Sequence, residues 1–191
     1  MTENPIVKMA STIRDKVGTT NKFTLPEIAT LMTVNTSFPD FSSSATVIKN
    51  GASQSLNSTI NVNGGDTIEY TFSYTANHEQ LLRKLIGTNT KLSFSLPVIM
   101  YTDSDWTSKA TSQTIHILRK DNSNLIDPIS IEAGNTQYQY SGLYVNQQLT
   151  NSIVDYLITN QPIVVKYDNV GSHDNLKMLT TGTLNLWVYQ N

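Results

Sequence analysis

The chain has 191 residues, a net charge of −2 and no cysteine, which excludes a disulfide framework and any thiolate metal site. Only 15% of the residues are charged, no cluster of lysine and arginine could neutralise nucleic-acid phosphates, and no apolar run reaches the roughly 18 residues of a membrane span. The N-terminus also lacks the layout of a secretory signal, so we expect a protein that folds in a cytoplasm, has no nucleic-acid or membrane partner, and holds together by packing alone.

Residues 5–32 are predicted to form two short helices joined by a turn. In the first half, apolar residues recur at three- and four-residue steps and so share one helical stripe: Ile6, Met9, Ala10, Ile13 and Val17. In the second half, Thr24 precedes Glu27 by three residues, which is the spacing of a capping box. Helices this short are marginal alone. We therefore expect an apolar face to dock on a sheet or on another copy, and to be centred on Ile13, Val17, Ile28 and Met32.

The run from Met9 to Ala29, MASTIRDKVGTTNKFTLPEIA, resembles a short module of tail and baseplate proteins from bacteriophages that infect Gram-positive bacteria. The shared features are isoleucine–arginine, then a lysine, a glycine and small hydroxyl residues, then threonine–leucine–proline–glutamate. The resemblance covers only this segment, and the rest of the chain resembles no specific family. It implies a virion component, assembled in the host cytoplasm as a homo-oligomer together with other virion proteins.

A polar stretch over residues 35–44 indicates a linker, in which Phe38 and Phe41 are expected to pack on the chain's own sheets or on a neighbouring subunit. After it, Asn50-Gly51 is the strongest two-residue hairpin signal. Strands are expected over 45–49, 56–62, 67–75, 92–100, 126–131, 137–145, 162–167 and 183–189, with another around Ile115 and Ile117. Pro97 indicates an edge position or a bulge within its strand.

Two segments among these strands have helical apolar spacing. Residues 78–87, HEQLLRKLIG, predict a short helix that caps one end of a sheet, while residues 151–158 fit either a helix or a buried strand. Many strands at short spacing favour a mainly β fold, an antiparallel β-sandwich of jelly-roll type. The alternative is a tail-tube-like sandwich that lends strands to a ring. The expected division is a helical hairpin over 1–34, the linker over 35–44 and the sandwich over 45–191.

Few residues point to catalysis. There is no nucleophile elbow and no phosphate-binding loop, and the three histidines lie far apart in the sequence: His78, His116 and His173. His116 alternates with two isoleucines and is expected to face solvent. Nothing in the sequence pairs two carboxylates as a glycosidase requires. We expect no enzyme activity, no cofactor and no metal, and interpret Asp103 and Asp105 as a solvated loop rather than as calcium ligands.

Aromatic residues give the most suggestive binding signal. Within the sequence QYQYSGLY, Tyr138, Tyr140 and Tyr144 share one strand face, and glutamine side chains lie on the other. Exposed aromatic rings offer a flat apolar surface to a sugar, but the same pattern is more typical of a core or a subunit interface. Trp106, in the loop sequence TDSDWTS, is the best single candidate for an exposed ring. Trp187 is expected to face a second sheet or a partner.

These features predict a non-enzymatic structural component of a phage virion, in the tail tip or baseplate, that assembles as an oligomer and contributes to host attachment. The first alternative is a carbohydrate-binding module that recognises host cell-wall polysaccharide through Trp106, Tyr138, Tyr140 and Tyr144. A further alternative is a head or tail-tube building block. The sequence leaves open the host, the ligand, the oligomer number and the position within the virion.

Overall fold

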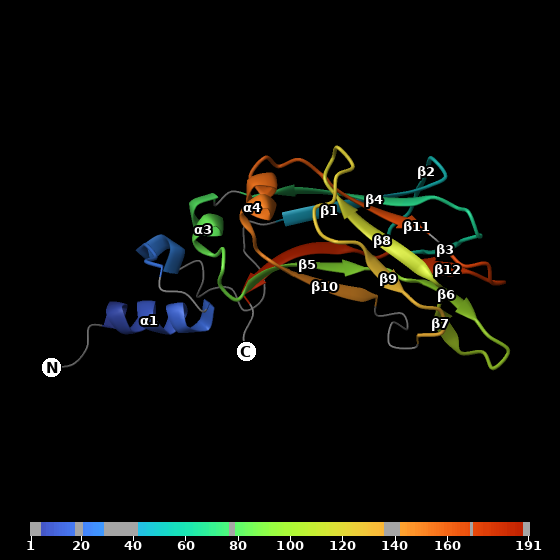
Figure 1. Ribbon diagram of the computed structural model, residues 1–191, viewed down its shortest axis with the longest axis horizontal. Helices are drawn as coiled ribbons and strands as arrows, with labels where there is room; N and C mark the ends of the chain where they lie inside the picture. The colour runs from blue at the N-terminus through green and yellow to red at the C-terminus, as the bar shows by residue number, and fades with distance from the viewer. Residues whose placement is uncertain are drawn as a thin grey trace.

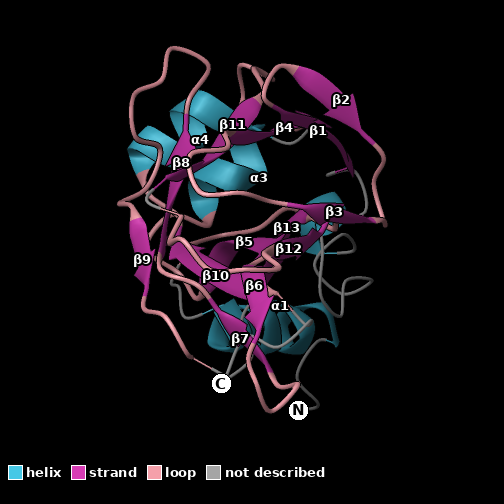
Figure 2. Ribbon diagram, turned by 90° about the vertical axis from the view of Figure 1, so that its right-hand side faces the viewer, coloured by secondary structure: helices cyan, strands magenta, loops and turns pink. Residues whose placement is uncertain are grey.

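The computed structural model describes residues 5–17, 21–28, 42–76, 79–135, 142–168 and 170–188 (Figure 1). Within these ranges strands outnumber helices, and every strand pairing is antiparallel. One six-stranded sheet faces two smaller sheets in a sandwich-like arrangement (Figures 1 and 2). The mainly β, antiparallel part of the predicted fold class is therefore confirmed.

The six-stranded sheet has the order β2-β1-β4-β11-β8-β9. Its strands are β1 (Ser42–Lys49), β2 (Ala52–Gln54), β4 (Ile68–Thr75), β8 (Gln113–Leu118), β9 (Ile129–Ile131) and β11 (Ile163–Asp168). The hairpin expected at Asn50-Gly51 joins β1 to β2, with Lys49 opposite Ala52. The φ angles of Asn50 and Gly51 are 49° and 79°. Both are positive, as a two-residue hairpin turn of type I′ requires.

The opposing layer consists of a three-stranded sheet, β10-β5-β13, and a four-stranded sheet, β3-β12-β6-β7. Its strands are β3 (Thr59–Asn61), β5 (Thr90–Leu96), β6 (Ile99–Thr102), β7 (Ser108–Ala110), β10 (Leu143–Gln148), β12 (Lys177–Leu179) and β13 (Thr183–Val188). The chain runs from β5 straight into β6, and from β12 straight into β13. The two small sheets are thus consecutive stretches of one long antiparallel pair that is broken in the middle.

The break lies at Pro97 and corrects the expectation of a single strand over 92–100. Ser95 pairs with Thr183 and Ile99 pairs with Met178, so one strand uses four steps where its partner uses five. One extra residue on one side of an antiparallel pair is the property of a bulge. The extra residue lies on the partner strand, between Met178 and Thr183, and not in the strand of Pro97, where the sequence indicated a bulge. Proline has no N–H to donate to a sheet, so the ladder stops there and a second sheet begins.

Aromatic side chains fill the space between the layers. Phe72 of β4 packs edge-on against Phe94 of β5, with ring centroids 6.3 Å apart, and the Tyr70 hydroxyl donates to the Met178 sulfur at 4.0 Å. The Tyr167 hydroxyl donates to the Pro97 carbonyl at 2.9 Å. Burial raises the pKa of the Tyr70 and Tyr167 hydroxyls, which keeps them neutral donors. Phe94 and Met178 therefore point inward, and their strand neighbours point away from the core.

The helices lie at one end of the sandwich (Figure 1). They are α1 (Pro5–Val17), α3 (Glu79–Lys84) and α4 (Asn151–Leu157). In α4 the Thr150 hydroxyl caps the first turn by accepting from the Ile153 N–H at 3.2 Å. The helix buries Ile153, Val154 and Leu157, so the helical alternative holds for residues 151–158 and the strand alternative does not. Arg83 of α3 binds Asp155 of α4 at 2.8 Å.

The N-terminal segment, α1 with the helical turn at residues 25–28, is attached to α3. The Glu27 carboxylate pairs with the Lys84 ammonium at 2.8 Å, and the Asn21 side chain donates to the Lys84 carbonyl at 2.6 Å. Glu27 also accepts from the Thr24 N–H at 2.6 Å. That contact is half of the expected capping box. The Thr24 hydroxyl lies 3.0 Å from the same carboxylate and donates to it, in place of accepting a backbone N–H.

Two of the four predicted docking residues are buried within this chain. Ile13 and Ile28 are 5% and 3% exposed and belong to the same cluster of buried side chains as the sandwich core. The Val17 side chain, Met32 and the segment with Phe38 and Phe41 lie outside the described residues, so the hairpin and the domain boundaries stay predictions. No helix in the described ranges is long and apolar enough to cross a membrane.

Replacing Glu27 with glutamine should loosen this attachment. Burial alone would raise the pKa of Glu27, but hydrogen bonds from Lys84 and Thr24 outweigh it and hold the pKa below its ordinary value. The pair therefore stabilises the fold fully above the ordinary glutamate pKa of about 4.3, and loses this effect as pH falls through the lower folded value. We expect Glu27→Gln to lower the free energy of unfolding by about 1 kcal/mol near neutral pH.

Urea titration measures this change, and hydrogen exchange over residues 21–28 should quicken in parallel. Glu132→Gln is the control, because Glu132 is exposed. Equal stability of Glu27→Gln and the unmodified chain from pH 3 to pH 7, the roughly relevant window for a carboxylate, would contradict the role given to the ion pair.

Candidate functional site

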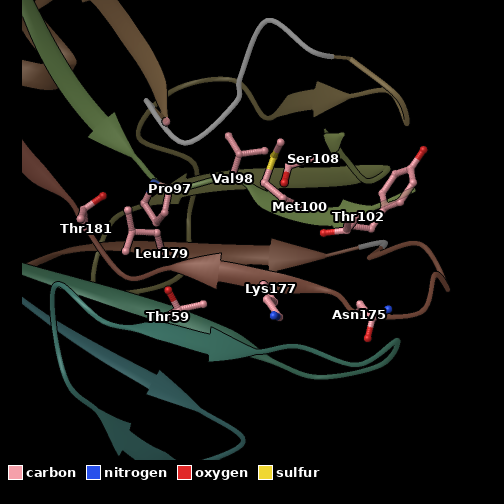
Figure 3. Close-up of a pocket in the computed structure, with 12 residues that line it drawn as sticks. Thr59, Pro97, Val98, Met100, Thr102, Ser108, Asn175, Lys177, Leu179 and Thr181 are labelled. Carbon is pink, nitrogen blue, oxygen red and sulfur yellow. The ribbon is translucent and has the colours of Figure 1, made fainter. Parts of the chain in front are cut away.

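The four-stranded sheet carries a pocket of about 220 Å³ on the face turned away from the core (Figure 3). Since Met178 points inward, its neighbours Lys177 and Leu179 point outward, and Lys177 lies opposite Met100 in the pairing of β12 with β6. Figure 3 shows side chains from β6 and β7 along one side of the pocket and side chains from β12 and β3 along the other. The pocket is thus built mainly from β3, β6, β7 and β12, together with residues of the connections next to these strands.

The lining combines an apolar surface with polar groups. Apolar atoms come from Pro97, Val98, Met100 and Leu179. Hydroxyl groups come from Thr59, Tyr101, Thr102, Ser108 and Thr181, an amide from Asn175, and a positive charge from Lys177. Small-ligand sites are typically apolar concavities with a few polar groups that fix orientation. This composition suits a small polyhydroxylated ligand.

The loop between β6 and β7 continues from the pocket and presents Trp106. Trp106 is 87% exposed and has a φ of 61°, which is uncommon for a residue other than glycine. Asp103 holds the loop: its carboxylate accepts from the Asp105 and Thr107 N–H groups at 3.0 and 2.9 Å and forms an ion pair with Lys109. The Trp106 N–H donates to the Asp103 carbonyl at 3.0 Å. The indole is therefore raised into solvent on a fixed turn.

The ion pair and these backbone contacts also bear on the calcium alternative. Lys109 first, and then the Thr107 N–H, hold the pKa of Asp103 below its ordinary value. The Asp103 carboxylate therefore already binds groups of its own hairpin. Among the residues that the structure describes, no group of three or more histidine and acidic side chains could hold a metal ion.

Gly142 and Tyr144 mark the other end of the pocket. Gly142 lines it with a φ of 75°, and an added Cβ would lie 2.6 Å from the Leu96 carbonyl oxygen, so only glycine fits there. Tyr144, two residues further on, is 61% exposed and pairs with Ser95, on the outward face of β5. The lining extends along the chain from Pro97 through β6 to Thr102, five residue steps and therefore roughly 16 Å.

The candidate saccharide-binding residues thus fall into two groups. Trp106 and Tyr144 are exposed. In the sequence, Trp106 follows the lining residue Thr102, and Tyr144 follows the lining residue Gly142. Tyr138 and Tyr140 lie outside the described residues, as does the Trp187 side chain, although the backbone of β13 places Trp187 opposite Lys91. The common strand face expected for Tyr138, Tyr140 and Tyr144 therefore stays a prediction.

The two histidines that the structure describes, His116 and His173, have separate partners. His116 is 27% exposed in its side chain and lies 3.2 Å from Asp168, so it is less open to solvent than its alternation suggested. His173 is exposed and stacks on the Tyr101 ring, with centroids 4.0 Å apart and an interplanar angle of 6°. His78 lies outside the described residues. The Tyr101–His173 stack borders the pocket because Tyr101 lines it.

Comparison of the chain with protein-family models, with curated proteins and with solved structures found no match. Function must therefore be argued from the residues themselves. Sequence reasoning singled out Trp106 and Tyr144 but missed Lys177 and Leu179, because β12 has only three residues and shows no readable alternation. It also interpreted Met100 as an ordinary strand residue, since nothing local reveals that its sheet faces outward there.

We expect Asp103→Ala to release the Trp106 loop. The variant removes the acceptor of two loop N–H groups and the partner of Lys109, so the amides of Asp105 and Thr107 should exchange hydrogen faster. Because the folded pKa of Asp103 is lowered, the unmodified loop should hold its contacts above the ordinary aspartate pKa and lose them as pH falls through the folded value.

Asp121→Ala provides the matched control. Asp121 also accepts from a turn N–H, that of Ser123 at 2.9 Å, but it lies in the connection between β8 and β9. It should leave exchange at the Trp106 loop unchanged. Equal exchange rates in the Asp103→Ala variant and the unmodified chain would show that another contact holds the loop.

Proposed function

We propose that this chain is a non-enzymatic structural component of a phage tail tip or baseplate, and that it contacts the host surface with one end. The observation that carries the proposal is that two features lie at opposite ends of the sandwich. The N-terminal helical segment lies at one end, and the β6–β7 loop, which contains Trp106, lies at the other (Figure 1). The resemblance of residues 9–29 to a phage tail module supports attachment through the helical end. The proposal includes two predictions about the fold: the sandwich is of jelly-roll type, and the N-terminal segment forms a complete helical hairpin.

Assembly with other copies of the chain is part of the proposal. Ile13 and Ile28 are used inside the chain, so an intermolecular contact needs other apolar side chains on the segment. Val7 and Leu25 are available, at 50% and 57% exposed. Single exposed apolar residues are ordinary on protein surfaces. Val7 and Leu25 matter here because they lie on the N-terminal segment, part of which resembles the phage module. We propose that a second copy of the chain covers them.

Carbohydrate binding is the second candidate function, and it is compatible with the first. In the described ranges, Trp106 and Tyr144 are the exposed large aromatic residues. Each of them follows, in the sequence, a residue that lines the pocket. An aromatic ring and an apolar pocket floor can cover the C–H face of a sugar while hydroxyl and amide groups bind its hydroxyls. A host cell-wall polysaccharide is the proposed ligand. A head or tail-tube position remains a further alternative, which electron microscopy of labelled particles would distinguish.

The assembly proposal predicts that charge on the helical segment dissociates the oligomer. Sedimentation velocity of the full chain should show an oligomer, and the double variant Val7→Glu, Leu25→Glu should sediment as a monomer, because two buried carboxylates without partners are costly at an apolar contact. Thr12→Glu, an exposed position on α1, is the control and should leave the oligomer intact. A monomeric unmodified chain would refute this part of the proposal.

For carbohydrate binding, we expect Trp106→Ala to weaken the affinity for host cell-wall polysaccharide by about tenfold, or about 1.4 kcal/mol. Trp106 is 87% exposed, so its removal should leave the melting temperature unchanged and separate binding from folding. Titration calorimetry with the purified polysaccharide measures the change, with Leu56→Ala, another exposed apolar residue, as the control. If the unmodified chain does not bind the polysaccharide, the carbohydrate-binding function is wrong.

A further inference from the structure

We propose that the pocket on the outer face of β3-β12-β6-β7 recognises an anionic sugar unit, one that carries a phosphate or a carboxylate, and that Lys177 selects the negative charge. This inference rests on the carbohydrate-binding part of the proposed function and names the class of ligand. A sugar phosphate and a uronic acid share the required chemistry, namely hydroxyl groups, a C–H face and one negative charge.

The first argument is the uncompensated charge of the pocket. Among the residues that the structure describes, Lys177 is the one charged residue in the lining, and no carboxylate lines the pocket. Within the described part of the chain Lys177 is exposed and forms no ion pair. Other lysines of this acidic protein do pair with carboxylates: Lys49, Lys84, Lys109 and Lys166. The free ammonium group at Lys177 is therefore available to an external anion.

The nearest carboxylates in sequence do not cancel this charge. Two acidic residues adjoin the lining: Asp103 follows Thr102, and Asp174 precedes Asn175. Asp103 is neutralised by Lys109 and by the loop amides. Asp174 is exposed on a turn and does not line the pocket. Among the described lining residues, the charge at the pocket is thus that of Lys177.

The second argument is the placement of the other groups around Lys177. Leu179 lies two residues along the same strand face, roughly 7 Å away, and the pairing places Met100 directly opposite Lys177, roughly 5 Å across the sheet. Figure 3 shows Thr59 on the same side of the pocket as Lys177 and Leu179, with Thr102 and Ser108 across from them. A cation, an apolar patch and several hydroxyl groups therefore lie within the span of one small molecule.

The size of the pocket limits what it can hold. About 220 Å³ is less than the roughly 300 to 1,000 Å³ typical of drug-sized ligand sites, so it suits one small unit rather than a whole chain. Trp106 and Tyr144 are exposed and follow lining residues in the chain, Thr102 and Gly142 respectively, so they are the proposed contacts of neighbouring units of a polymer. The charged unit would sit at Lys177 and the flanking units near the aromatic rings.

Titration of the full chain with matched sugars tests the inference. The probes are glucose, glucose 1-phosphate, glucuronic acid and inorganic phosphate, followed by NMR chemical shifts. We expect each anionic sugar to bind about tenfold more tightly than glucose, as a charged hydrogen bond allows, and Lys177→Gln to abolish the difference. The preference should also fall between roughly 0.01 M and 1 M salt, where the screening length drops from roughly 30 Å to 3 Å.

Lys120→Gln, an exposed lysine on a turn outside the pocket, is the matched control and should keep the preference. Preference for only one of the two anionic sugars would still support the inference and would identify the charge that is read. Equal binding of glucose and the anionic sugars would overturn it while leaving neutral saccharide binding intact. Inorganic phosphate binding as tightly as glucose 1-phosphate, or no binding of any probe, would also overturn it.

Discussion

The hydrogen bond from the buried Tyr167 hydroxyl to the Pro97 carbonyl joins the core to the point where the second layer breaks. Before Pro97, even-numbered residues such as Phe94 point inward. After it, Ile99 is fully buried and Met100 lines the outer pocket, so the alternation has shifted by one. A one-residue shift exchanges the two faces of a strand. Without the break, Met100 and Thr102 would lie on the face toward the six-stranded sheet, and the outer pocket would lose one of its walls.

The same break explains why the two ends of the molecule differ. On the β5 side, the long antiparallel pair leads toward the helical end, where α3 forms ion pairs with Asp155 of α4 and with Glu27 of the N-terminal segment (Figure 1). On the β6 side, the pair leads to a short hairpin whose turn is fixed by Asp103 rather than by packing. One end is therefore held by ion pairs between helices and by the buried side chains of Ile13 and Ile28, and the other presents side chains to solvent. This difference in construction, more than any single residue, supports the proposal of a protein that links two partners.

Much of the fold could be predicted where local chemistry decides structure. The Asn50-Gly51 turn needs two positive φ angles, and the alternation of Tyr70, Phe72 and Tyr74 in β4 leaves one buried face; both signals lie within a few residues. The pocket could not be predicted, because β3, β7 and β12 have three residues each and become strands only through their partners. Lys177 is an example: its outward direction depends on the contact of Met178 with Tyr70, 108 residues away.

Trp106 has one property that could be predicted from the sequence and one that could not. Its exposure was predictable from a polar loop, but its φ of 61° was not, because this backbone conformation is uncommon for a residue other than glycine. Asp103 stabilises the turn locally, with a single carboxylate that binds two loop amides and Lys109. Holding the backbone that carries an aromatic ring in one conformation before a ligand arrives lowers the entropy cost of binding. The ion pair also removes Lys109 and Asp103 from the local charge balance, so the hairpin presents its indole to solvent while the charge next to the pocket remains that of Lys177.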